Sequence, residues 1–386
     1  MDILQTLRKV NTKPVNLILI YSVIGLLGLN YLLYSFFDLG GIRNLIRAAA
    51  AGGMFLLLLL RFADDKLGRR QVVMLGLAAC QILLGGTNGL NIAFLLILTV
   101  VVAEYPRCRV STVVFWIMVG LTALVAVSLL LGIQENEVYQ VGNRIRHKLG
   151  FENVNSASMF LFTLLTAYLL HRGEKAGVLD LAAVMVLEVI SFLFTDSRTP
   201  LLGLILMVAL YLVIPRIPEN IARWIARVAV ALLFLTPYLW PLPVVNSDLV
   251  NKILSLRPMY CDAYFRGQNA LTFLVGGSRL KELDNGYLLL MFNTGVIVYT
   301  VIYFQVQSAV ENLCRGGKRM ELAFVLTMLA CSVLEGSAVR PELLCAPLLW
   351  ILILEALPGK GRPSLIMTRV RGWLSGDVGT DETGGN

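Results

Sequence analysis

The sequence predicts an all-α polytopic membrane protein, with about twelve transmembrane helices in a single integral membrane domain over residues 1–386. Three observations support this fold class. The chain is 57% hydrophobic and only 15% charged, whereas about a quarter of the residues in a soluble domain are charged. Apolar tracts of about 17 to 25 residues recur along the chain, and each is long enough to cross about 30 Å of hydrocarbon as a helix. Positive charge concentrates in alternate connecting segments.

The first tract predicts a helix that is retained in the mature protein. It follows Arg8, Lys9 and Lys13 and runs from Val15 to Phe37 without a small-residue cleavage site, so it does not match a signal peptide. Further apolar tracts follow, separated by polar, glycine-rich or basic segments. In chain order, the predicted spans are 15–37, 44–60, 71–88, 90–105, 110–132, 155–170, 177–195, 199–214, 225–240, 286–306, 321–338 and 342–357.

The distribution of Lys and Arg predicts which side of the membrane each connection faces. An even number of spans places both termini on one side. If that side is the cytoplasm, 21 of the 33 Lys and Arg residues lie in cytoplasmic segments, in agreement with the excess of positive charge in cytoplasmic loops. We therefore expect both termini in the cytoplasm. The net charge of +8 is explained by this topology, and no nucleic-acid partner is expected.

Two long connections face outward in this topology. The first extracytoplasmic loop covers 133–154 and the second, larger one covers 241–285. The larger loop lies between the ninth and tenth spans and contains "PMYCDAYFRGQNALTFLVGG", which begins at Pro258 and ends at a glycine pair. Proline is favourable at the start of a helix, so we expect one amphipathic helix that lies against the membrane surface or over the bundle.

No nucleotide-binding or metal-binding pattern is present in the connections. The cytoplasmic segments contain no phosphate-cradling glycine loop, which argues against an energy-coupled pump. The six cysteines include no CxxC pair and there are only two histidines, so neither a metal nor a cofactor is expected. The cysteines are interpreted as packing residues, and a pairing of Cys331 with Cys345 stays open.

The first outer loop contains a basic stretch, "VGNRIRHKLGFENVNSAS". Arg144 and Arg146 supply positive charge close to Asn155, at the start of a span. Guanidinium groups bind phosphate bidentately, and each charge-assisted hydrogen bond contributes on the order of 1.5–3 kcal/mol. A lipid-linked phosphate is therefore a candidate ligand. The alternative is an ordinary solvated basic loop that contacts lipid headgroups.

A polar stretch, "FTDSRTPLLG", separates two apolar tracts. Asp196 and Arg198 are expected in a short outer turn, which is either purely structural or part of a site. Glu188 lies in the apolar tract that precedes this stretch, the predicted span 177–195. An unpaired acid inside a span costs about 2.5 kcal/mol or more. Glu188 is expected to face the bundle interior, and its role stays open.

A third polar group precedes the tenth span, in "LKELDNGYLLLMFNTG". If the helix starts near Asp284, this residue is a natural N-cap and shares one face with Tyr287 and Leu288. Capping does not explain the neighbouring Asn285 and Glu282. An acid flanked by amide and phenol groups is a candidate general base for a hydroxyl nucleophile, a role that contributes about 10²- to 10⁴-fold in rate.

Taken in order, these stretches resemble a known family. "RIRHKLGFENVNSAS", "FTDSRTPLL", and "SLRPMY" followed by "LDNGYLLLMFNTG" are similar to motifs of the Wzy-type repeat-unit polymerases of O-antigen and capsule, which are related to the O-antigen ligases. The resemblance extends from about Arg144 to Gly295 in motifs. It departs from the family pattern where Val154 replaces the proline of Asn-Pro-Asn, and where Asp284 stands in place of the histidine of many ligases.

The resemblance implies glycosyl transfer at the outer face of the cytoplasmic membrane. A growing glycan on undecaprenyl pyrophosphate would be transferred to a hydroxyl of a new lipid-linked repeat unit, without a cofactor. It implies that Asp284, or second Glu282, is the catalytic base, and that Asn285 and Tyr287 position it. Positive charge for the pyrophosphate is implied at Arg144, Arg146, Arg198 and Arg257, with Asn155 alongside.

The partners that the resemblance implies are the lipid-linked oligosaccharide and polysaccharide, the flippase and chain-length regulator of the same pathway, and membrane lipids. Two other functions are alternatives. An O-antigen ligase would move finished polymer to another acceptor, although Asp284 in place of histidine argues against it. A transporter or flippase of a lipid-linked saccharide should have ionisable residues in several helices, yet few occur outside the loops beyond Glu188, Glu335 and Arg340.

Overall fold

The computed structural model describes residues 13–37, 39–63, 69–84, 86–102, 107–141, 144–254, 256–277 and 284–357. A helix occupies all or part of each predicted span, and the twelve helices differ in length. In chain order they are α2 (Lys13–Ser35), α3 (Gly40–Ala63), α4 (Arg69–Leu84), α5 (Gly86–Val102), α6 (Arg107–Leu130), α7 (Val154–Arg172), α8 (Val178–Thr195), α9 (Arg198–Val213), α10 (Glu219–Leu239), α14 (Gly286–Arg315), α15 (Arg319–Cys331) and α16 (Cys345–Ala356).

The described residues also form shorter elements in the connections. These are a two-stranded sheet of β1 (Val138–Val141) and β2 (Arg144–His147), the 3₁₀ turns η1 (Gly173–Lys175), η2 (Ile214–Arg216) and η3 (Gly336–Val339), and the helices α11 (Asp248–Ile253), α12 (Arg257–Arg266) and α13 (Ala270–Val275). The prediction of a helical multi-pass membrane protein is confirmed, because eight of the described helices are long and apolar enough to cross a membrane.

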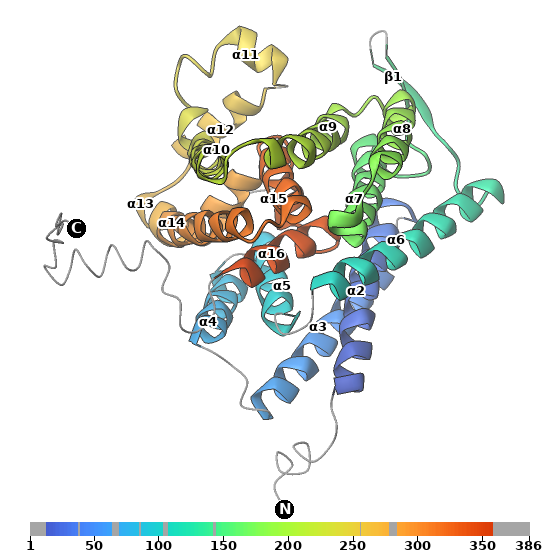
Figure 1. The fold of residues 1–386 in the computed structure, drawn as a ribbon, viewed down its shortest axis with the longest axis horizontal. Helices are drawn as coiled ribbons and strands as arrows, with labels where there is room; N and C mark the ends of the chain where they lie inside the picture. The colour runs from blue at the N-terminus through green and yellow to red at the C-terminus, as the bar shows by residue number, and fades with distance from the viewer. Residues whose placement is uncertain are drawn as a thin grey trace, which may run out of the picture.

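The helices form a bundle in which α14, α15 and α16 lie centrally (Figure 1). Most residues of α15 and α16 are buried, and α15 packs against α7, α9, α10, α14 and α16. In contrast, α8 exposes large apolar side chains such as Leu187 and Leu193. A helix that is apolar all round is buried or faces lipid. The outer surface of α8 is therefore suited to contact with acyl chains.

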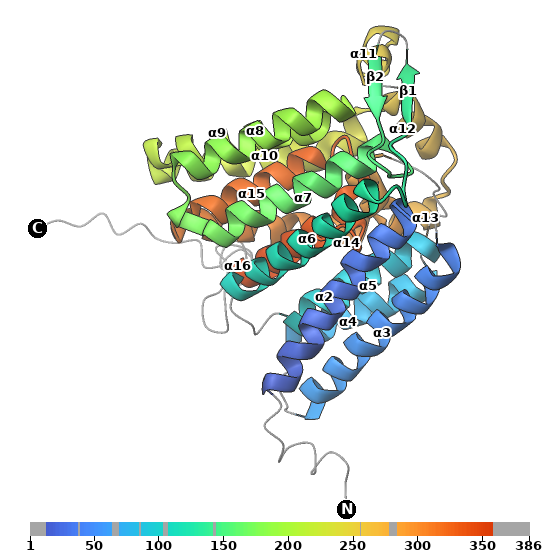
Figure 2. The same cartoon turned by 90° about the vertical axis from the view of Figure 1, so that its right-hand side faces the viewer.

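One end of the bundle carries most of the irregular structure. The β1–β2 hairpin, α11, α12 and α13 all lie at this end (Figure 2), and α14 begins there at Gly286. We call it the loop end. The hairpin was not predicted from the sequence. Its antiparallel register pairs Tyr139 with Arg146, and backbone alternation within a strand turns successive side chains to opposite faces.

The predicted single amphipathic helix from Pro258 to the glycine pair is wrong. The segment instead forms α12 and α13, which are separated at Gly267. The break has a local cause, because Asn269 caps a new helix: its side-chain oxygen accepts from the backbone N–H of Thr272 at 2.8 Å and from the Thr272 hydroxyl at 2.6 Å. A good N-cap stabilises a helix start by about 1 kcal/mol.

The glycine pair that ends α13 docks on a kink in α14. Gly295 has φ +77°, a non-helical value inside α14, and Gly276 has φ +90°. The backbone N–H of Gly277 donates to the carbonyl of Asn293 at 3.1 Å. A Cβ on Gly295 would lie 2.3 Å from the carbonyl oxygen of Leu274. Only glycine tolerates both this conformation and this approach, so the contact fixes the large loop against the membrane bundle.

The predicted span 321–338 is also wrong beyond Cys331. Helix α15 ends at that residue, and the chain continues through η3 to α16 without a long helix. The segment between α15 and α16 contains Gly336 and Pro341, both of which disfavour continuation of a helix. As a result, Glu335 and Arg340 lie in a connection at the loop end and not within a spanning helix. Cys331 and Cys345 are both buried and free.

Candidate active site

An ionic cluster at the loop end joins three connections that are far apart in the sequence. Arg257 is the first residue of α12, Asp284 precedes α14, and Glu335 precedes η3. The Nη2 atom of Arg257 lies 3.7 Å from Oδ2 of Asp284 and 3.9 Å from Oε1 of Glu335. We call these three residues the Arg257 cluster. It brings together two residues that the sequence analysis placed in the site and one that it did not.

The backbone around Arg257 holds the side chain in place. Leu256 has a left-handed φ of +64°, and α12 starts immediately after it with Pro258 in its first turn. The side-chain oxygen of Asn251 accepts from the N–H of Met259 at 3.0 Å, which ties α11 to α12. These contacts fix the backbone from which the Arg257 side chain extends. The side chain itself is 20% exposed, so a ligand can reach it.

The ion pairs of the Arg257 cluster are too long to be its main stabilising contacts. A charge-assisted hydrogen bond spans about 2.7–2.9 Å, and both Arg257 pairs exceed this. Pairs of this kind near a surface contribute roughly 0–1 kcal/mol. The Nε atom of Arg257 is buried and has no hydrogen-bond partner among the described residues. The described protein contacts therefore do not satisfy every donor of the guanidinium group.

Glu335 is the buried member of the cluster, with its side chain 12% exposed. Burial, and after it the nearby charge of Asp284, raise the pKa of Glu335 from its ordinary value of 4.5 to about 7. Arg257, Arg340 and a hydrogen bond from Thr199 act in the opposite direction. Glu335 can therefore exchange a proton near neutral pH, whereas an ordinary glutamate is fully ionised there.

The pKa of Glu335 predicts a pH-dependent stability. Because the folded protein binds this proton more tightly than the unfolded chain does, the stabilisation is complete below pH 4.5 and is lost as the pH rises through about 7. We expect the melting temperature of the purified protein to fall over this interval. The Glu335→Gln variant should show a smaller fall, since glutamine does not titrate. Equal slopes in both proteins would contradict the assignment.

The position of Asp284 relative to α14 differs from the prediction. Asp284 is not the N-cap of α14, because the side-chain oxygen of Asn285 accepts from the N–H of Leu288 at 2.9 Å and fills that role. The Asp284 side chain is 53% exposed, whereas Tyr287 and Leu288 are buried, so the three do not share one face. Freed from capping, the Asp284 carboxylate is open to solvent and to a substrate.

Asn285 and Tyr287 have structural contacts that the sequence did not predict. Besides capping α14, Asn285 donates through Nδ2 to the carbonyl of Val333 at 2.8 Å. The Tyr287 hydroxyl donates to the carbonyl of Leu329 at 2.8 Å, inside the bundle. Both contacts, together with the bond from the N–H of Gly286 to the carbonyl of Ser332 at 2.8 Å, fasten the start of α14 to the end of α15. They thereby bring Asp284 close to Glu335.

The two upstream motifs also meet at the loop end. Arg146 donates through Nε to the carbonyl of Thr195 at 3.0 Å and through Nη2 to the side chain of Asn155 at 3.3 Å. The hydroxyl of Ser197 donates to the same Asn155 oxygen at 3.3 Å. Arg146 and Asn155 therefore connect the hairpin to the turn between α8 and α9. The first two motifs therefore lie together, and Arg146 uses part of its donors on backbone carbonyls of the second one.

The structure describes the remaining three predicted residues to different extents. Arg198 is the first residue of α9 and is exposed, next to the Thr199 that contacts Glu335. For Arg144 the structure describes the backbone, in β2, and the side chain lies outside the described part. Glu282 lies outside the described residues altogether. Arg198 is therefore adjacent in sequence to a residue that contacts the Arg257 cluster, and its own side chain is exposed.

Sequence reasoning missed Glu335, Thr199 and Arg340 as members of this site. The reason is that the apolar tract 321–338 predicts one continuous span, which would place Glu335 inside a membrane helix. The signal that could have found Glu335 is its position directly before Gly336 and close to Pro341, since both residues end helices. An acid at a helix break is more accessible than an acid inside a span.

Glu188 takes no part in this cluster. It lies in α8 and is fully buried, and neither carboxylate oxygen has a hydrogen-bond partner within the described part of the chain. The expectation that it faces the bundle interior is confirmed. Among the residues that the structure describes, it forms no ion pair with an arginine.

The arrangement can bind an anion and accept a proton at adjacent points. A guanidinium group stabilises negative charge that develops on a leaving group, and a carboxylate within reach of the same site can act as a general base. No group of three or more metal-ligating side chains occurs in the described ranges. Comparison of the chain with protein-family models, with curated proteins and with solved structures found no match.

Proposed function

We propose that this chain is a membrane glycosyltransferase that polymerises undecaprenyl-pyrophosphate-linked oligosaccharide repeat units. The observation that carries the proposal is the Arg257 cluster, in which a partly exposed guanidinium group lies 3.7 Å from an exposed carboxylate and 3.9 Å from a largely buried one. Glycosyl transfer from a pyrophosphate needs these two functions side by side. The short motifs around the cluster support the same function, because they resemble those of Wzy-type polymerases.

The proposed reaction forms one bond and breaks one bond. The acceptor hydroxyl oxygen attacks the anomeric carbon of the donor glycan, and the bond from that carbon to the pyrophosphate oxygen breaks. Asp284 accepts the hydroxyl proton, with Glu282 as the second candidate. Arg257 stabilises the charge on the departing polyprenyl pyrophosphate, assisted by Arg198. Glu335 lies beside Arg257, and its partial protonation near pH 7 limits competition with the pyrophosphate for the guanidinium group.

The proposed setting is the bacterial cytoplasmic membrane, with twelve crossings, both termini in the cytoplasm and the loop end on the outer side. This orientation is supported by the basic residues of the alternate connections. The substrates are the lipid-linked oligosaccharide and the growing polysaccharide. The proposed partners are the flippase that delivers the units and the regulator that sets chain length. The product is O-antigen, capsule or exopolysaccharide.

The test is an electrophoretic ladder of lipid-linked glycans from cells that lack the gene, complemented with wild type or with Asp284→Asn. The variant keeps the size and hydrogen-bonding shape of the residue but loses the base. We expect at least about a hundredfold less polymer, with single repeat units still displayed outside and protein level unchanged. Units trapped at the inner face would indicate a flippase. A normal ladder that is not joined to its final acceptor would indicate a ligase.

A further inference from the structure

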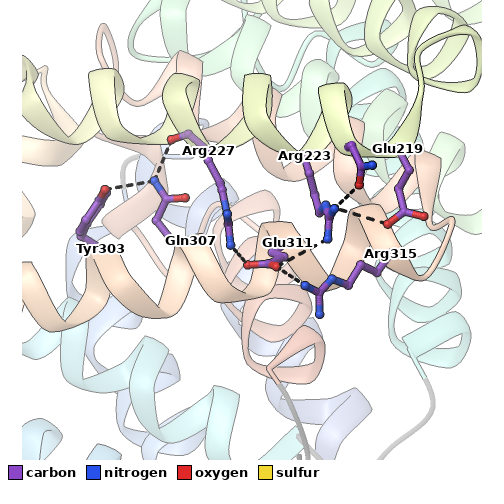
Figure 3. A network of polar contacts seen from close by, with 8 residues as sticks. Glu219, Arg223, Arg227, Tyr303, Gln307, Glu311 and Arg315 are labelled. Atoms are coloured by element: carbon purple, nitrogen blue, oxygen red, sulfur yellow. Dashed lines mark hydrogen bonds and ion pairs between the residues drawn. The ribbon is translucent and has the colours of Figure 1, made fainter. Parts of the chain in front are cut away.

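A second polar network lies between α10 and α14 (Figure 3). It is near the last residue of α14, Arg315, at the end of that helix opposite the loop end. Its centre is Glu311, whose side chain is only 8% exposed. Three arginines surround this carboxylate. Arg227 donates to Oε2, Arg315 donates to Oε1 at 2.5 Å, and Arg223 lies 4.0 Å from Oε1. We call these four residues the Glu311 network.

The Glu311 network carries more positive charge than its own carboxylate balances. Glu219 is the only other acid that contacts these arginines among the described residues, at 4.0 Å from Arg223, and its side chain is 57% exposed. The side chains of Arg227 and Arg315 remain 43% and 40% exposed. Since each guanidinium group has five N–H donors, several stay available to an anion from outside.

The position of the network corresponds to a membrane surface. Arg223 and Arg227 lie in the first turns of α10, and Arg315 is the last residue of α14. Along α14, Glu311 is 311 − 286 = 25 residues from Gly286 at the loop end, which corresponds to roughly 38 Å at a rise of about 1.5 Å per residue. This distance approximates the thickness of the hydrocarbon core. The guanidinium groups therefore lie at the level of lipid headgroups.

An exposed apolar face adjoins the arginines on α10. Ile221, Trp224, Ile225 and Val228 are all exposed and follow the spacing of one helix face. Trp224 is 66% exposed, and tryptophan is enriched at membrane interfaces, where its ring is at headgroup level. The same helix therefore offers donors for a phosphate next to a surface for acyl chains.

We propose that Arg223, Arg227 and Arg315 bind the phosphate headgroup of an anionic phospholipid in the leaflet opposite the loop end. Charge complementarity carries the assignment, since three guanidinium groups face one buried carboxylate at headgroup depth. The lipid phosphate accepts from the exposed donors of Arg227 and Arg315, and its acyl chain lies along the apolar face of α10. This proposal does not depend on the proposed glycosyl transfer.

The proposal is tested by native mass spectrometry of the purified full-length protein titrated with phosphatidylglycerol or with phosphatidylcholine. Wild type is expected to retain phosphatidylglycerol preferentially. The Arg227→Gln variant should bind it about tenfold more weakly, since one charge-assisted contact is lost. The matched control is Arg216→Gln, which removes one charge at the same end, outside the network. Equal losses in both variants would overturn a specific site.

A second variant separates lipid binding from a purely structural network. In Glu311→Gln the carboxylate no longer competes for the guanidinium groups, so affinity for phosphatidylglycerol should rise several-fold and the lipid should restore any lost thermal stability. No gain in affinity would overturn the proposal. The third test is competition with inorganic phosphate. If free phosphate at the same concentration fully displaces phosphatidylglycerol, the site binds any anion and does not need a lipid. This result would also overturn the proposed lipid site.

Discussion

The Arg257→Ala variant is expected to abolish polymer, with a loss of about 10²- to 10³-fold in polymerisation rate. This magnitude is typical for the removal of one preorganised donor to a developing charge. The structural reason is that Arg257 is the member of the Arg257 cluster that contacts both Asp284 and Glu335. Without it, the pyrophosphate of the proposed reaction would lose this cation, and the two carboxylates would no longer have a positive charge beside them. The measurement is the ladder of lipid-linked glycans in complemented cells.

Arg266→Ala is the matched control for this experiment. Arg266 ends the same helix, α12, but its side chain is 80% exposed, and its ion pair is with Asp262 on its own helix. We expect Arg266→Ala to give normal chain lengths. Arg257→Lys is a useful intermediate, because lysine keeps the charge but loses the planar fork of donors. Normal polymer in Arg257→Ala, at normal protein level, would eliminate this site.

Gly295→Ala is expected to be among the most destabilising single substitutions in the described bundle. The alanine Cβ would lie 2.3 Å from the carbonyl oxygen of Leu274 and 2.7 Å from the backbone nitrogen of Gly276. Both are backbone atoms, which cannot rotate away, and the φ of +77° adds strain for a residue with a Cβ. We expect a loss of about 3 kcal/mol in the free energy of unfolding, from strain and overpacking together.

The control for this prediction is Gly120→Ala in α6, where a Cβ would meet nothing within 4 Å. It should leave the melting temperature in detergent unchanged or slightly higher, since alanine favours a helix. Gly276→Ala removes the same contact from the other side, because its Cβ would lie 2.3 Å from the carbonyl oxygen of Asn293. The double variant should therefore cost less than the sum of the two single ones. Strict additivity would contradict a shared contact.

Loss of the Gly295 contact should also reduce activity beyond its effect on stability. Helix α13 docks on the kink of α14, and the same large loop carries Arg257 at the start of α12. If α13 moves away, Arg257 is no longer held opposite Asp284. We therefore expect Gly295→Ala to lower polymer in cells even when protein remains in the membrane, whereas Gly120→Ala should not.

The sequence by itself determined that this chain is a helical multi-pass membrane protein and where its long helices lie. The physical reason is local: an apolar tract of sufficient length must form a helix in hydrocarbon, because only then are its backbone groups satisfied. The sequence also drew attention to the stretches around Arg146, Arg257 and Asp284. It did so because charged residues at the ends of apolar tracts stand out against a background that is 57% hydrophobic.

The tertiary structure decided which of these residues belong together. Glu335 joins the Arg257 cluster only because α15 ends at Cys331 and the start of α14 bonds to the connection that follows. The Asn285 side chain caps α14 and donates to the carbonyl of Val333. The Asp284 side chain, in contrast, is exposed. Composition and spacing carry no information about such contacts, since they depend on the packing of segments far apart in the chain. The close approach of Gly276 and Gly295 is of the same kind, because each glycine needs the other only once the loop is folded onto the bundle.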